Sequence, residues 1–133
     1  MTDRKYLPSI GDLIDRLSID QIKEVLIPEH KEQYAAEMQD IVHDIDLAFQ
    51  DKKLDAKTIR AIIVIAQMNL HIWHNEAKCR TGEKDGNDLR LSHGLNGLRV
   101  QAKNKINTIL SGGNIDHKVD CLSADFKDWH ISW

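Results

Sequence analysis

One stretch of the sequence, residues 55–80, constrains the fold more than any other, because its apolar residues fall on two opposite sides of a helix at about 100° per residue. Those on one side are Ile59, Ile62, Ile63, Ala66, Leu70, Trp73 and Ala77, and those on the other are Ala61, Val64, Ile65, Met68, Ile72 and Cys79. A surface helix has one apolar side, so a helix with two is expected to be covered on both. We therefore predict a central helix between two layers of partners, which can be helices of the same chain, a second copy, or both.

The length and composition fit a single helical-bundle domain over residues 1–133. Hydrophobic residues make up 41% of the chain and charged residues 29%, as in ordinary folded domains. The longest apolar run, Ala61 to Ala66, is far shorter than the roughly 18 residues of a membrane span. The amino terminus lacks a secretory signal pattern. We therefore expect a soluble cytoplasmic protein whose two cysteines, Cys79 and Cys121, are reduced.

Capping residues and a proline set the bounds of the first two helices. Ser9 and Asp12 have the spacing of a capping box and begin the first helix. Ser18 and Gln21 repeat that spacing, so we predict that the first helix is broken there. It ends before Pro28, which disfavours helical geometry in the residue before it and suits the first turn of the second helix.

The remaining helices are bounded in the same way. Asp55 is placed to cap the central helix, and a glycine-containing loop separates it from a fourth helix over residues 88–111, which Gly112 and Gly113 end. A short helical turn is expected in the C-terminal tail, where the apolar anchors are Leu122, Phe126, Trp129 and Trp133. Short connections favour antiparallel neighbours. The fold class that we predict is all-α, an antiparallel bundle of four main helices, the first helix broken, with a short C-terminal helical turn.

The segment SIGDLIDRLSIDQIK, residues 9–23, resembles an opening that recurs in several uncharacterised small all-helical proteins. The shared pattern is serine-isoleucine-glycine, an acid, Leu-Ile-Asp, a basic residue, leucine, and then serine or threonine. The resemblance covers 15 of the 133 residues. It implies no activity, and no functional residue can be transferred from it.

The predicted fourth helix carries the polar residues of greatest interest. Its apolar stripe consists of Leu91, Leu95, Leu98, Ala102, Ile106 and Ile109. The opposite face holds His93, Asn96, Gly97, Val100, Asn104 and Asn107, flanked by Arg90, Arg99 and Lys103. In a helix, asparagine is less favourable than alanine by up to about 0.7 kcal/mol and glycine by about 1 kcal/mol. The three asparagines of this face, together with Gly94 and Gly97, therefore lower the intrinsic stability of the helix by roughly 3 to 4 kcal/mol. Some interaction is expected to offset that loss.

Two arrangements would offset the loss, and the sequence leaves both open. In the first, glycines admit another backbone while the asparagines and His93 form hydrogen bonds across a helix–helix or subunit contact. In the second, the face binds a small anionic or sugar-like ligand, with Arg99 and Lys103 supplying positive charge. We favour the first, and with it a non-catalytic binding or assembly module. The alternative is a small enzyme or ligand-binding domain acting on a phosphorylated or nucleotide-sugar substrate.

Seven residues are the candidate ligand-binding residues, five on the fourth helix and two on the central helix: His93, Asn96, Arg99, Lys103, Asn104, His71 and His74. In an enzyme, His93 would be the acid or base, because histidine titrates nearest to neutral pH. His71 and His74 are neighbours on the helix surface, but catalytic zinc needs a third protein ligand, and no recognised metal-site or phosphate-loop pattern is present. We therefore expect no metal and no cofactor.

The distribution of charge and the central helix suggest which partners to expect. The net charge of -3 argues against nucleic-acid binding. Residues 89–115 contain no acid, whereas residues 29–51 are rich in acids, which we interpret as a basic and an acidic helix that lie close together. One small bundle has few helices with which to cover both sides of the central helix, so we expect a homodimer built partly on it. No membrane association is expected.

Overall fold

The computed structural model describes residues 8–80, 86–111 and 131–133, and this part of the chain contains helices and no strands. The helices are α1 (Ile10–Leu26), a 3-10 turn η1 (Pro28–His30), α2 (Lys31–Ala48), α3 (Ala56–Arg80) and α4 (Gly86–Ser111). The all-α prediction with four main helices is therefore confirmed. The predicted C-terminal helical turn lies outside the described residues.

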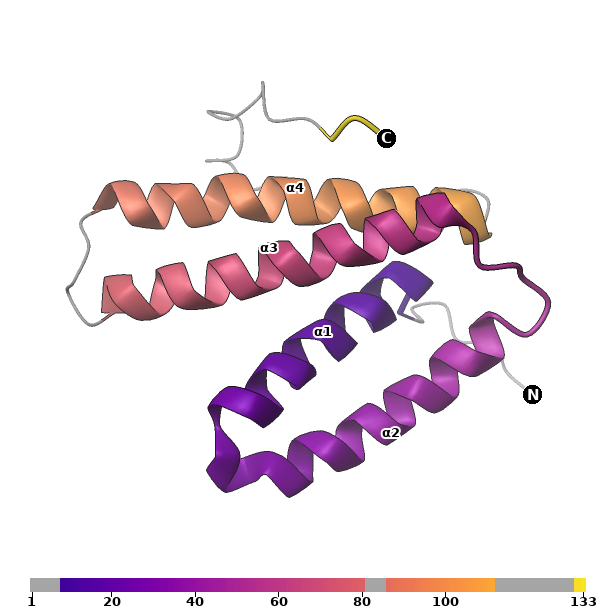
Figure 1. The fold of residues 1–133 in the computed structure, drawn as a ribbon, viewed down its shortest axis with the longest axis horizontal. Helices are drawn as coiled ribbons and strands as arrows, with labels where there is room; N and C mark the ends of the chain where they lie inside the picture. Colours follow the sequence, from indigo (N-terminus) through magenta and orange to yellow (C-terminus); the bar gives the residue numbers. More distant parts are fainter. Residues whose placement is uncertain (1–7, 81–85, 112–130) are drawn as a thin grey trace.

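The helices form two hairpins, α1 with α2 and α3 with α4 (Figure 1). Helix α1 lies between the other helices, because it packs against α2 on one side and against both α3 and α4 on the other. The backbone of α2 comes close to α1 and η1 but not to α3 or α4. From its N-terminal end, α1 runs away from α3, so the two helices diverge toward Leu26 (Figure 1).

Helix α1 begins at the predicted capping box but is not broken. The Ser9 hydroxyl accepts from the Asp12 amide at 3.1 Å, and the Asp12 carboxylate accepts from the Ser9 amide at 3.3 Å. The helix then runs without interruption to Leu26, just before Pro28. The expected break at Ser18 is wrong, since its hydroxyl accepts a hydrogen bond from Asn69 of α3 at 3.3 Å instead of capping a second helix. Ser18 could cap a helix, but here it contributes to the packing of α1 against α3.

Helix α3 is the single long helix that the central stretch predicts. Asp55 caps it, because its Oδ1 accepts from both the Thr58 amide at 2.8 Å and the Thr58 hydroxyl at 2.7 Å. These bonds hold the pKa of the Asp55 carboxyl below its usual value. None of the helices in the described ranges is long and apolar enough to cross a membrane.

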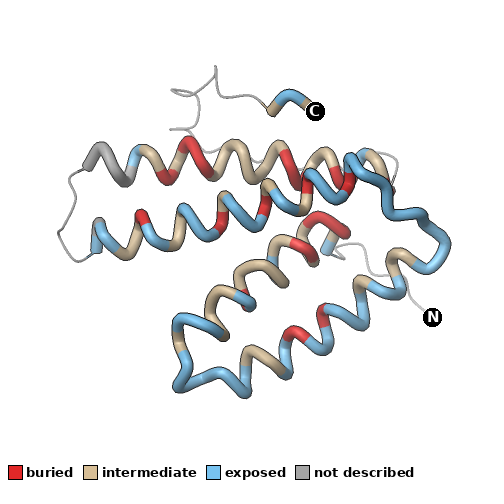
Figure 2. The backbone as a smooth tube through the Cα atoms, viewed as in Figure 1, coloured by how far each residue is buried: buried red, intermediate tan, exposed pale blue. Residues whose placement is uncertain are grey.

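The core lies between α1, α3 and α4 (Figure 2). Its buried members are Ile10, Ile14, Ala61, Ile65, Ala102, Ile106 and Leu110. The predicted apolar stripe of α4 faces this core, with Leu95, Ala102 and Ile106 buried. At the end of α2, Ile45, Ala48 and Phe49 pack against the same cluster. The last residues join it too, since Trp133 packs on the core and the Ser132 carbonyl accepts from Arg60 at 2.8 Å.

Within the described residues, the two apolar sides of α3 are covered unequally. On one side Ala61 and Ile65 are fully buried, whereas on the other Ile59, Ile63 and Leu70 are 45%, 50% and 44% exposed. The reason is that α1 and α4 share one side of α3, while the backbone of α2 does not approach it. Among the residues that the structure describes, the expected covering is therefore seen on one side of α3.

Candidate functional site

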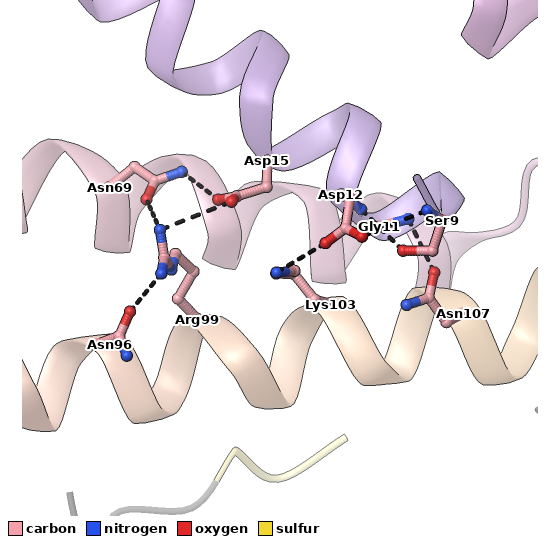
Figure 3. A network of polar contacts seen from close by, with 9 residues as sticks. All are labelled: Ser9, Gly11, Asp12, Asp15, Asn69, Asn96, Arg99, Lys103 and Asn107. Carbon is pink, nitrogen blue, oxygen red and sulfur yellow. Dashed lines mark hydrogen bonds and ion pairs between the residues drawn. The ribbon is translucent and has the colours of Figure 1, made fainter. Parts of the chain in front are cut away.

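The polar face of α4 packs against α1 (Figure 3). Its residues meet polar residues near the start of α1 and one asparagine of α3. We call this set the polar seam, and its members are Gly11, Asp12, Asp15, Asn69, Asn96, Arg99, Lys103 and Asn107.

At one end of the seam, Asn107 and Gly11 join the backbones of α4 and α1. The Asn107 side chain, 2% exposed, accepts from the Gly11 amide at 2.8 Å. This amide belongs to the first turn of α1, where backbone donors have no partner within the helix. A Cβ on Gly11 would lie 2.9 Å from both the Asn107 Oδ1 and the Lys103 carbonyl oxygen. Glycine is therefore required for this close approach.

In the next turn of α4, Lys103 forms an ion pair with Asp12 at 2.8 Å. The lysine side chain is only 10% exposed, so its charge is neutralised inside the protein. Burial by itself would raise the pKa of the Asp12 carboxyl, but the hydrogen bond and charge of Lys103, together with the bonds at Ser9, hold this pKa below its usual value. This lysine is already occupied and points to α1, away from any external ligand.

One turn further along α4, Arg99 links three helices. Its Nη1 lies 3.6 Å from Asp15 of α1 and 3.4 Å from the Asn69 Oδ1 of α3, and its Nη2 donates to Asn96. Asn69 in turn donates to Asp15 at 2.8 Å. The Nε of Arg99 is buried and makes no hydrogen bond. The charge of Arg99 is thus partly offset by Asp15, and its position is fixed by two amides.

Where α1 diverges from α3, the seam opens into a cleft of about 410 Å³, which we call the interhelical cleft. It is lined by residues of all three helices: Ile19, Ile22, Asn69, Ile72, Trp73, Glu76, Ser92, His93, Asn96 and Arg99. Isoleucines and Trp73 form an apolar wall, while the α4 residues and Glu76 form a polar wall. Behind it, the Asn75 amide donates to the Ser92 hydroxyl at 2.8 Å, which ties α3 to α4.

The predicted site residues fall into separate places. His93, Asn96 and Arg99 line the interhelical cleft. Lys103 belongs to the closed part of the seam, and Asn104 is half-buried and does not line the cleft. His71 and His74 are exposed and line a different hollow of about 700 Å³, which we call the α3 groove. The structure therefore does not bring the two α3 histidines together with His93.

The prediction that the acidic helix lies beside the basic helix is wrong, because the backbone of α2 does not come close to α4. The basic residues Lys103 and Arg99 instead face Asp12 and Asp15 of α1. Among the described residues, no group of three or more histidine, cysteine, aspartate or glutamate side chains could hold a metal ion.

Neither the α1 side of the seam nor Asn69 was among the site residues predicted from the sequence. A usable pattern was present, since Gly11, Asp15 and Ser18 recur at the spacing of one helical face and are all small or polar. These residues belong to the segment that resembles other small helical proteins. The polar residues of that segment therefore have a structural role here, because Asp12, Asp15 and Ser18 bind side chains of α3 or α4. Asn69 lies in α3 between the apolar residues Met68 and Leu70, so no run of polar residues marked it.

Comparisons of the chain with protein-family models, with curated proteins and with solved structures find no match.

Proposed function

We propose that this protein is a non-catalytic binding module that holds a small polar molecule in the interhelical cleft. The observation that carries the proposal is that three predicted ligand-binding residues, His93, Asn96 and Arg99, line one cleft together with isoleucines and Trp73. Its volume of about 410 Å³ lies within the range of small-molecule sites. An apolar wall with a few convergent polar groups is the usual make-up of such sites.

The charges at the cleft favour a neutral ligand. Arg99 has Asp15 at 3.6 Å, Glu76 adds a carboxylate to the lining, and Lys103 is held by Asp12 away from it. Little positive charge is left for a phosphate, which needs charge-assisted donors. A sugar-like or nucleoside-like molecule fits better, because hydroxyl or amide groups match the polar wall and a planar or aliphatic part matches Trp73 and the isoleucines.

The hydrogen bonds support binding rather than catalysis. A serine nucleophile requires an adjacent base that takes its proton. The Ser92 hydroxyl instead accepts from the Asn75 amide, which provides no base, and Asn96 is bound to Arg99. These groups position one another, as expected of a preorganised binding surface.

A matched pair of histidine variants tests the proposal. The full chain is screened by thermal shift and ligand-observed NMR against neutral sugars, nucleosides, nucleoside phosphates and nucleotide sugars. A ligand at 100 times its Kd stabilises the native state by about 2.7 kcal/mol. We expect a neutral compound to raise the Tm, His93→Ala to abolish the response, and His71→Ala, outside the cleft, to leave it unchanged.

Other results would require a different function. If only phosphorylated compounds or nucleotide sugars respond, the alternative substrate class replaces the neutral ligand. Conversion of a bound compound during the NMR experiment would show that the module is an enzyme. If no compound responds, or if both histidine variants behave alike, the cleft is not the binding site.

Two finer expectations from the sequence, a homodimer and a cytoplasmic location, stay predictions. The exposed side of α3 supports the existence of a partner without identifying it. Size-exclusion chromatography with light scattering at micromolar concentration tests the dimer, and a monomer would remove that prediction.

A further inference from the structure

The exposed side of α3 has the residue spacing of a helix-docking surface. Its exposed apolar residues are Ile59, Ile63, Ala66 and Leu70, which lie four, three and four positions apart. The spacing continues through the half-buried Trp73 and Ala77. Such a repeat, with about 3.5 residues per turn, is what a second helix packs against in a coiled coil. We call the four exposed residues, Ile59, Ile63, Ala66 and Leu70, the α3 stripe.

The exposed charges of α3 have one sign. Every exposed charged side chain from Ala56 to Arg80 is basic, and these are Lys57, Arg60, Lys78 and Arg80. His71 and His74 are exposed on the same helix. The one acid within these bounds, Glu76, lines the interhelical cleft instead. A partner that carries carboxylates would complement this surface.

The surface is also hollowed around Leu70. On one side Leu70 lines the α3 groove together with His71, His74 and Leu91. On the other side it lines a hollow of about 220 Å³ with Val25 and Leu26 of α1, which are 65% and 43% exposed. A helix of a partner protein can place its side chains in these hollows, whereas a flat protein surface cannot fill them.

From this combination we infer that the α3 stripe docks an acidic amphipathic helix of a partner protein. Apolar side chains of the partner cover Ile63 and Leu70, and its flanking carboxylates face Arg60, which also binds Ser132, and His74. This is the helix-in-groove mode of recognition, in which anchors recur every three or four residues.

Charge and pattern favour this partner over a second copy of the chain, which is the occupant that the predicted homodimer would place on the α3 stripe. In an antiparallel pair of α3 helices, the basic flank of one copy would face the same basic flank of the other. Helix α2 has the exposed acids, but its exposed apolar residues Val42 and Leu47 lie about 140° apart around the helix at 100° per residue, so it offers no continuous stripe.

A pair of synthetic helices tests the inference on the full chain. The probe is a fluorescent peptide of three heptads, about 21 residues, with leucine at the core positions and glutamate at the flanks. Its matched control has lysine in place of glutamate. By fluorescence anisotropy, we expect the acidic peptide to bind and the basic peptide to bind at least about tenfold more weakly, given the charges on α3.

Matched surface variants locate the binding. Leu70→Glu is expected to weaken binding of the acidic peptide by about tenfold or more, since it places a charge in the apolar stripe. His74→Glu should weaken it by about threefold, as for an exposed charge contact. The controls on α2, Leu47→Glu and His43→Glu, should change nothing. If Leu70→Glu loses the helical circular dichroism of the wild type, Ile63→Gln replaces it.

Several results would overturn the inference. Equal binding of the two peptides, binding of neither, or binding that is insensitive to the α3 variants would each do so. Phosphatidylserine vesicles that bind in place of the peptide, with the same sensitivity to Leu70→Glu, would indicate a membrane surface. Self-association that Leu70→Glu removes in light scattering would indicate a second copy. None of these results bears on the interhelical cleft, which Leu70 does not line.

Discussion

At the scale of single residues, the packing of α1 on α4 depends on a few closely packed and hydrogen-bonded residues, and substitution of any of them would disrupt it. Gly11 has no room for a methyl group, and its amide is satisfied by a side chain 96 residues away in sequence. Lys103 is buried beside Asp12, which neutralises its charge. A buried polar contact is costly when one partner is removed, because the other is left without a hydrogen bond.

Gly11→Ala should lower the free energy of unfolding. Overpacking costs about 1–3 kcal/mol, while the better helix propensity of alanine returns about 0.5–1 kcal/mol. Urea denaturation of the wild type and the variant measures the difference. Asn107→Ala is the companion variant, since it removes one of the two clashing groups but leaves the Lys103 carbonyl. The cost of Gly11→Ala should shrink in that background without vanishing, and a neutral or stabilising Gly11→Ala would contradict the close approach.

A substitution of Asp20, unlike that of Gly11, is predicted to raise the free energy of unfolding at pH 7. Its side chain is buried, with an Oδ2 that makes no hydrogen bond, in a residue 3% exposed. Burial and the negative charge of Glu37 on α2 raise the pKa of Asp20, although Lys23 and Arg16 on α1 oppose this. Between the usual carboxyl pKa and the raised value, the native state binds more protons than the unfolded state, so the contribution of Asp20 to stability falls as pH rises through that window.

Asp20→Asn should therefore stabilise the protein at pH 7, by about 1 kcal/mol, and have little effect at pH 3, where the wild-type carboxyl is protonated in both states. Urea denaturation at the two pH values checks this. Asp12→Asn is the contrasting variant, because the pKa of Asp12 is lowered and its contribution is present at pH 7 and lost as pH falls. If Asp20→Asn destabilises the protein at pH 7, the carboxylate has a favourable contact and the assigned cause is wrong.

At the scale of helices, α2 differs from the rest because most of its surface is exposed. Met38 and Ile41 are its only buried residues, and among the described helices its backbone comes close to α1 and η1 but not to α3 or α4. Helices α3 and α4, by contrast, lie together along their length (Figure 1). Regions with few buried apolar contacts open at a lower free energy than the global transition.

Amide hydrogen exchange should accordingly show weaker protection in α2 than in the middle of α4. We expect amides near Met38 and Ile41 to exchange through local opening, while those near Ala102 and Ile106 exchange only on global unfolding. Exchange measured by NMR at several urea concentrations distinguishes the two. Equal protection across α2 and α4 would mean that the two hairpins unfold as one unit.

The helices were predictable from the sequence, whereas their mutual orientation was not. Caps such as Ser9 and Asp55, and the stripe with Leu95 and Ile106, are local patterns, so they marked the helices and the core side of α4. The partner of the polar face was not local, because it depends on how α1 is rotated against α4. The candidate site was therefore predicted in part, since His93 was proposed but not the opposing wall of Ile19 and Trp73.

At the scale of the whole molecule, the two hairpins meet through α1, so α2 and α3 present separate outer surfaces. One is the acidic surface of α2, and the other is the basic and apolar surface of α3. The proposed cleft and the proposed docking surface lie on different sides of α3, because the cleft involves Ile72 and Glu76 while the stripe involves Ile63 and Leu70. Two ligands could thus bind at the same time through one helix.

The attachment of α2 to α1 has a mechanical consequence. Helix α1 is held over its first half, where Asn107 and Lys103 bind its start and Asn69 binds Asp15 and Ser18, and it diverges from α3 toward its far end, beside the cleft. A small tilt of the rest of α1 would narrow or widen the cleft and would move α2 with it as a lever arm. The distance between spectroscopic labels on α2 and on α3 would therefore change by more than the width of the cleft.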